Sequence, residues 1–190
     1  EYLAFWEGRQ WPDRPRPGET RLTVNYARAL VRKVTSVLFS RPVRYSVPAS
    51  SAAEHALAEL ATEDDWHGLD YAAALDAAVL GDAAFKVTWD AARQRPRLTT
   101  VDPAQLVVAT RPDDPREVVG LAHEYPLAVG AVEAVFGVRL PALGPEGWVT
   151  VREEWSAGHY RLSVAGQVLH DGANPYGGIP YVLGPNSPAP

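Results

Sequence analysis

The chain has 190 residues, of which 46% are hydrophobic and 22% are charged, and its formal net charge is -5. This composition can bury a core, which excludes a mainly disordered chain, and no apolar run approaches the roughly 18 residues that a membrane-spanning helix needs. The absence of cysteine excludes disulfides and thiolate chemistry, and the acidic balance argues against a dedicated nucleic-acid-binding domain.

The N-terminal segment predicts a loop followed by an amphipathic helix. The opening apolar run ends at Gly8, and the prolines of residues 11–18 predict a loop because proline lacks an amide donor. Apolar residues spaced three and four apart then predict a helix over 23–39. We expect three residues of this helix to be buried against Phe85, Val87 or Trp89, namely Leu30, Val34 and Val37.

The next segment predicts a short strand and two helices. Residues 43–47 alternate apolar and polar side chains, as a strand does. Ser51 and Glu54 form a capping-box pattern before a helix over 52–60. A second, alanine-rich helix over 69–80 precedes Gly81, a residue type that favours a helix C-terminus.

Beyond Gly81 the apolar period changes from helical to two. This change predicts hairpins, with one short helix between them. The expected strands are 84–89, 98–101, 106–109, 118–125, 148–155 and 160–164, and the helix is 129–136. Helices followed by hairpins predict an α+β fold, with N-terminal helices packed on an antiparallel sheet. We expect one such domain over 1–173 and a proline-rich, extended exit segment over 174–190.

The charges are distributed unevenly along the chain. Residues 1–45 hold nine of the 18 Lys and Arg residues against four acids, so this part is basic and the remainder is acidic. A basic surface on an acidic body favours contact between subunits. The candidate contact residues are Arg28, Arg32, Lys33, Arg41, Arg44, Trp6 and Trp11. The alternative is that the arginines pair with local acids and that the tryptophans are buried in the fold.

No residue cluster has the spacing that catalysis or metal binding requires. The densest group of carboxylates and imidazole, residues 63–67, consists of adjacent positions, which point apart on a helix. We therefore predict no catalytic residue, no metal site and no cofactor. The alternative function is a metal-assisted hydrolase that uses Asp64, Asp65 and a distant histidine.

Four phrases occur in the order seen in one protein family. They are Tyr2-Leu3-Ala4-Phe5-Trp6-Glu7-Gly8; Asn25-Tyr26 with Leu38-Phe39-Ser40-Arg41-Pro42-Val43-Arg44-Tyr45; Leu80-Gly81-Asp82-Ala83-Ala84-Phe85-Lys86-Val87 with Val101-Asp102-Pro103; and Asn174-Pro175-Tyr176-Gly177-Gly178-Ile179-Pro180-Tyr181-Val182. Together they resemble the N-terminal, wing region of tailed-bacteriophage portal proteins, the head-to-tail connectors. Ser40 stands where the family usually has glycine.

The resemblance implies a structural role. It implies a subunit of the portal ring, generally a dodecamer, at one capsid vertex, through which DNA is packaged and ejected. The implied partners are other copies of the subunit and, through parts of a longer protein, a packaging ATPase, the capsid and head-completion proteins; no membrane partner is implied. The implied location is the virion, assembled in the cytoplasm of the bacterial host, from a phage or a prophage.

The resemblance also leads us to expect that this chain is a wing-domain fragment. The lack of any methionine and the proline-rich end agree with a segment of a longer protein whose stem helices follow. The remaining alternatives are a different capsid or tail structural protein and an interaction module of another class. For the isolated fragment, we expect weak DNA binding because a net charge of -5 repels phosphate.

Overall fold

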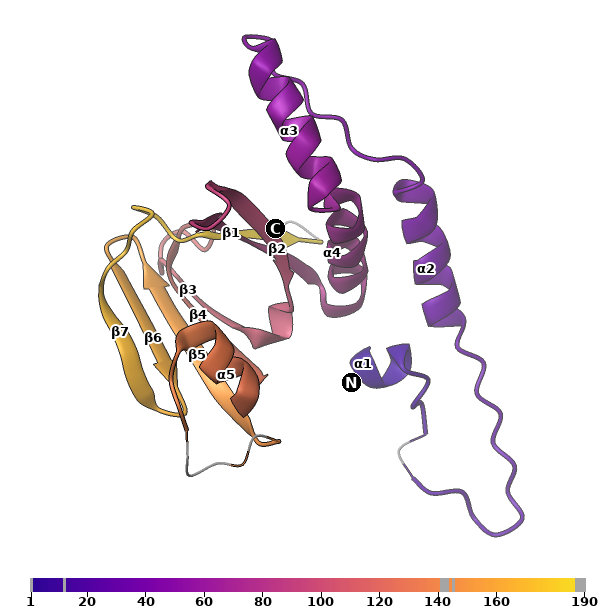
Figure 1. Cartoon of the computed structure of the whole chain (residues 1–190). Coiled ribbons are helices and arrows are strands. Elements are labelled where there is room, and N and C mark those ends of the chain that lie inside the picture. Colours follow the sequence, from indigo (N-terminus) through magenta and orange to yellow (C-terminus); the bar gives the residue numbers. More distant parts are fainter. Residues whose placement is uncertain (1, 12, 141–143, 145, 187–190) are drawn as a thin grey trace. The chain divides into compact units, whose positions relative to one another are not determined.

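A computed structural model describes residues 2–11, 13–140, 144 and 146–186 of the chain. The predicted α+β class is confirmed: N-terminal helices precede two antiparallel sheets built from hairpins (Figure 1). Contacts between Cα atoms divide the chain into two compact units. Unit 1 comprises residues 1–103 and 181–190, and unit 2 comprises residues 104–180.

Four helices begin unit 1. They are α1 (Tyr2–Trp6), α2 (Tyr26–Leu38), α3 (Ser51–Glu63) and α4 (Trp66–Leu80). Helix α4 ends at Gly81, as predicted, because φ is +97° there and glycine adopts that conformation without a Cβ clash. Helices α1, α2 and α3 each contact α4, so α4 is the helix around which unit 1 is organised.

Helix α2 confirms the predicted periodicity but not the predicted packing. Leu30, Val34 and Val37 are 66%, 49% and 60% exposed, and Val87 and Trp89 are exposed as well. The expected packing of this helix face against the sheet is therefore wrong. Instead α2 contacts α4, and Thr35, which is 3% exposed, is its one buried residue. Val31 and Thr35 lie one turn apart on the side of the helix opposite Leu30.

Two local predictions before α4 are also wrong. Residues 43–47 form no strand, because the amide of Val47 donates to the Glu54 carboxylate at 3.1 Å and not to a partner strand. This bond also removes Glu54 from the predicted capping box. The N-cap of α3 is Ser50, whose hydroxyl accepts from the amide of Ala53 at 3.2 Å, one residue earlier than we predicted.

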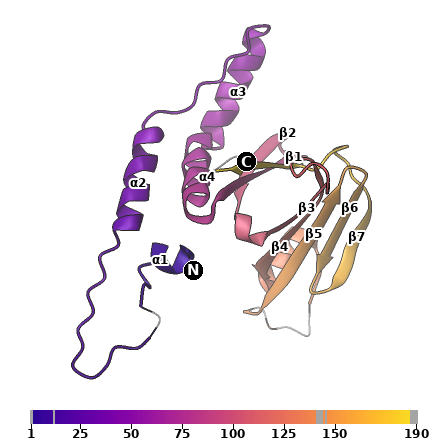
Figure 2. The ribbon, with the colours of Figure 1, turned by 180° about the vertical axis from the view of Figure 1, so that it is seen from behind.

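A three-stranded sheet completes unit 1. Its order is β2 (Arg95–Val101), β1 (Asp82–Asp90) and β8 (Tyr181–Pro185), so the predicted hairpin is confirmed. Strand β8 lies within residues 174–190, for which we expected an extended segment, and Val182 pairs with Phe85 of β1. Helix α4 contacts β1 and β2, and within unit 1 it lies between this sheet and α2 (Figures 1 and 2).

Unit 2 is a five-stranded antiparallel meander with one helix. After the 3-10 helix η1 (Pro103–Gln105), the strands are β3 (Leu106–Thr110), β4 (Val118–Ala128), β5 (Trp148–Ser156), β6 (His159–Val164) and β7 (Gln167–Ala173), in that spatial order. Helix α5 (Val129–Phe136) has the predicted bounds. Its Val132 packs with Val151 and Val164, all 0% exposed, in the core of the unit. No helix in the described part of the chain is both long and apolar enough to cross a membrane.

Candidate subunit interface

The first part of the candidate surface is a junction between α1 and α2. Asn25 holds the two helices together, because its amide nitrogen donates to the carbonyl oxygen of Trp6 at 2.8 Å and its amide oxygen caps α2 at the amide of Arg28, 3.0 Å away. The Trp6 ring then faces two guanidinium groups. Those of Arg28 and Arg32 lie 5.5 and 5.9 Å from its centroid, within cation–π range. The structure therefore brings Trp6, Arg28 and Arg32 into one cluster.

Arg28 has an unusual environment in this cluster. Its residue is half-buried, and its Nε atom is buried without a hydrogen-bond partner among the described residues. No described carboxylate forms an ion pair with Arg28 or with Arg32. Two cations share one indole ring here without an anion, so the cluster favours an approaching negative group.

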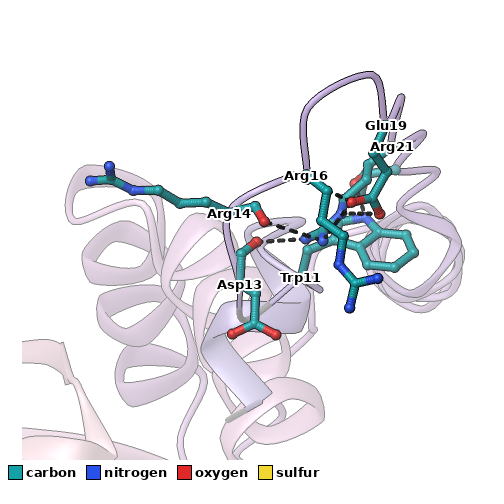
Figure 3. Close-up of polar contacts among 7 residues, drawn as sticks. Trp11, Asp13, Arg14, Arg16, Glu19 and Arg21 are labelled. Atoms are coloured by element: carbon teal, nitrogen blue, oxygen red, sulfur yellow. Dashed lines mark hydrogen bonds and ion pairs between the residues drawn. The ribbon is translucent and has the colours of Figure 1, made fainter.

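The loop between α1 and α2 is organised by Arg21, a residue outside our sequence-derived set (Figure 3). Its guanidinium donates to the carbonyl oxygens of Asp13 and Arg14 at 2.5 and 3.3 Å, and to the Glu19 carboxylate at 2.7 Å. This hydrogen bond from Arg21 is the main cause that lowers the pKa of Glu19. The guanidinium also lies 5.0 Å from the ring centroid of Trp11. The loop is therefore held together by the hydrogen bonds of Arg21.

Trp11 consequently belongs to a different cluster from Trp6. Its indole nitrogen donates to the Thr23 hydroxyl at 3.1 Å, and the residue is 50% exposed. In Figure 3 the guanidinium groups of Arg14 and Arg16 point away from the Arg21 contacts. The loop thus presents one tryptophan edge and two further cations at the surface.

The three remaining candidate residues are isolated cations. Lys33, Arg41 and Arg44 are exposed, and no ion pair joins them to any residue that the structure describes. The structure does not bring them into the Trp6 cluster. All three lie in residues 24–45, a segment that contains five cations and no Asp or Glu.

The most prominent feature of this surface is apolar, and our residue set did not include it. The exposed face of α2 carries Tyr26, Leu30, Val34 and Val37, which recur every three or four residues and which we call the α2 stripe. Tyr26 is 76% exposed. An amphipathic helix buries its apolar face against another element, yet here the less exposed residues of α2 are Arg28, Val31 and Thr35. The periodicity itself was the available signal, and only its interpretation as a core face was wrong.

The segment after α2 has the opposite charge. Residues 46–81, which include α3 and α4, contain seven acids and no Lys or Arg. Arg95 of β2 pairs with two of these acids, Glu63 and Asp64, the latter at 2.6 Å. No described ion pair joins the remaining acids to the cations of residues 24–45.

The residues of the acidic cluster at 63–67 make contacts within unit 1. Asp64 pairs with Arg95, and the Asp65 carboxylate accepts from the amide of Gly68 at 3.2 Å as the N-cap of α4. His67 is half-buried, and its Nδ1 atom is buried without a hydrogen-bond partner among the described residues. Within the described ranges, no three His, Cys, Asp or Glu side chains gather closely enough to hold a metal.

Unit 2 contains a buried carboxylate that is already satisfied. Glu153 is 5% exposed and accepts from the Tyr125 hydroxyl at 3.1 Å and from the Trp155 indole at 3.2 Å. Burial, and then the charge of Glu153, raise the pKa of Tyr125 and of Tyr160 above the ordinary tyrosine value. Both phenols therefore stay protonated at neutral pH, and Tyr125 acts as a donor to Glu153. This arrangement stabilises the core of unit 2.

Comparison with known protein families gives a match over part of the chain. Residues 10–134 match the family model described as "Phage portal protein, SPP1 Gp6-like". No protein in the curated collection matches the chain significantly. The family match includes α2, α3, α4, the hairpin of β1 and β2, and the first part of unit 2.

Proposed function

Because this chain belongs to the SPP1 Gp6-like family of phage portal proteins, we propose that it is part of the wing of a portal subunit. Proteins of this family are structural components of the virion that form ring oligomers and associate with the capsid. The proposed ring stands at the capsid vertex and serves as the conduit for DNA during packaging and ejection. The proposed wing region belongs to a longer subunit, whose other parts contact the packaging ATPase and the head-completion proteins.

The observation that carries the proposal is the family match over residues 10–134. The surface of unit 1 supports it, because exposed apolar residues on α2 lie beside cations without acidic partners. Surfaces of this kind are typical of contacts between protein subunits, where a neighbouring copy buries the apolar residues.

We propose that the candidate residues act in contact between subunits, but in two different ways. Arg32, Lys33, Arg41 and Arg44 are exposed and can pair directly with acids of a neighbour. Trp6 and Arg28 are half-buried, so they support the junction of α1 with α2. Trp11 provides exposed aromatic surface on the adjacent loop.

Ring assembly of the full-length protein tests the proposal. We expect size-exclusion chromatography with light scattering to show one closed oligomer, and negative-stain images to show rings. Reversal of the exposed cations Arg32, Arg41 and Arg44 to Glu should shift the protein towards smaller species while leaving its melting temperature nearly unchanged. The control is Arg116→Glu, an exposed cation in the turn before β4. A wild-type protein that stays monomeric at all concentrations would contradict the proposed function.

A further inference from the structure

No described residue of the chain covers the α2 stripe. Leu30 and Val37 are 66% and 60% exposed, and the adjoining Leu38 is 70% exposed. Helix α2 is 13 residues long, which corresponds to about 20 Å of helix. Leaving such a face in water forgoes about 25 cal/mol for each Å² of apolar surface. A partner that buries it therefore gains free energy.

We propose that the α2 stripe of one copy packs against the outer face of α3 in the next copy, with the cations of α2 beside the acids of α3. The inference rests on the ring assembly proposed above, and it goes further by assigning the two faces that meet. It makes the contact head-to-tail, because α2 and α3 are different surfaces of the same chain.

The outer face of α3 has the properties that this contact needs. Helix α3 is also 13 residues long and contacts α4, and none of its residues is fully buried. Its exposed positions include Ala52, Ala56 and Glu59. In Figures 1 and 2 the N-terminal end of α3 extends beyond the other elements of unit 1, which leaves this face accessible.

The side chains of the two faces are complementary in size. Leu30, Val34 and Val37 form a ridge at intervals of four and three residues. Ala52 and Ala56 lie one turn apart on α3, and small side chains at this spacing leave a groove that larger residues can enter. A ridge of branched residues on a face of alanines allows the two helix axes to approach closely.

The charges favour this pairing and oppose the simplest alternative. Residues 24–45 carry five cations without an acid, whereas the exposed acids of α3 are Glu59 and Glu63. Glu63 pairs with Arg95, and Glu59 has one described ion pair, with His55 of the same helix at 3.3 Å. A symmetric contact of α2 with α2 would bring two such cationic segments together, which costs free energy. Contact of α2 with α3 brings opposite charges together.

A mixing experiment with the full-length protein tests the assignment. One variant reverses the charge on and beside α2, with Lys33→Glu and Arg41→Glu. The other reverses the charge on α3, with His55→Lys and Glu59→Lys. All four side chains are exposed, and none makes an ion pair that holds unit 1 together. We expect each variant alone to assemble at least tenfold more weakly than the wild type, by the concentration at which oligomers dissociate.

Mixing the two variants should restore assembly. The reversed α2 of one variant then meets the reversed α3 of the other, and both contacts regain opposite charges. With an affinity tag on one variant, native mass spectrometry should find equal numbers of the two in the oligomer. One chain that carries all four substitutions should also assemble. The matched control mixes the α3 variant with Arg116→Glu, which should assemble by itself without giving oligomers that hold equal numbers of the two.

Four results would overturn the inference. Wild-type rings together with an α3 variant that assembles normally would refute the assignment and leave the proposed function intact. Two variants that each fail and do not restore each other would also refute it. Binding of the wild type to vesicles containing anionic lipid, lost in Leu30→Asp, would show that α2 is a membrane-surface helix instead. A wild-type protein without any oligomer would refute both the inference and the proposed function.

Discussion

Leu30→Ala measures directly whether α2 uses its apolar face inside the chain. Complete burial of a leucine side chain contributes about 1.5–3 kcal/mol, and Leu30 is 66% exposed, so about a third of that contribution is at stake. Alanine is also the better helix former, which offsets a small part of the loss. We expect the substitution to lower the free energy of unfolding by about 0.5–1 kcal/mol.

A substitution of a buried residue in the same unit provides a reference value for the loss in the free energy of unfolding. Val101 of β2 is 6% exposed, and its truncation removes two methyl groups from a packed site. We expect Val101→Ala to lower the free energy of unfolding by about 2 kcal/mol, from about 0.8 kcal/mol for each buried carbon group and a further contribution from the cavity. Urea unfolding followed by circular dichroism, at concentrations where the protein is monomeric, measures both. A loss of 2–5 kcal/mol for Leu30→Ala would refute our account of α2.

Three further substitutions test other parts of the structure. Gly81→Ala should destabilise the protein by about 1 kcal/mol, because φ is +97° at this residue. Gly130→Ala in α5 is the control and should not destabilise it, since both sites have space for a Cβ but Gly130 does not have a positive φ. Thermal melts of the two variants measure the difference. Burial, and then repulsion by Asp102, raise the pKa of Asp76, so the ionised carboxylate destabilises the folded state as pH increases. Asp76→Asn should therefore raise the melting temperature at pH 7 and lose this advantage below pH 4. Equal gains in melting temperature at both pH values would contradict this. Arg21→Ala should expose residues 9–23 to limited proteolysis at least several-fold faster, and cleavage at the wild-type rate would show that Arg21 does not hold the loop.

The sequence predicted those elements whose signals are local. Helix α5 has the predicted bounds because an apolar helical pattern ends at Gly137, where φ is +68°. The hairpin of β1 and β2 followed from alternation on both sides of a turn. Strand β8 was not predicted, because it lies among prolines and glycines and its partner β1 is about 100 residues earlier in the chain. Pairing over such a distance leaves no local signal.

The candidate interface shows a different limit of sequence reasoning. The spacing of Leu30, Val34 and Val37 correctly indicated an amphipathic helix. Periodicity shows that a face requires a cover, but it does not show whether the cover comes from the same chain or from another copy. The basic residues 24–45 were visible in the sequence, whereas the role of Arg21 in folding its loop depends on carbonyl oxygens that no motif identifies.

An electron cryomicroscopy reconstruction of the full-length oligomer tests the central claim most directly. The account predicts a closed ring in which the α2 stripe of every subunit is covered by the neighbouring copy, with Leu30, Val34 and Val37 buried at the contact. A ring in which these residues remain in solvent would contradict the proposed contact, and a protein that forms no ring would contradict its assignment as a portal subunit.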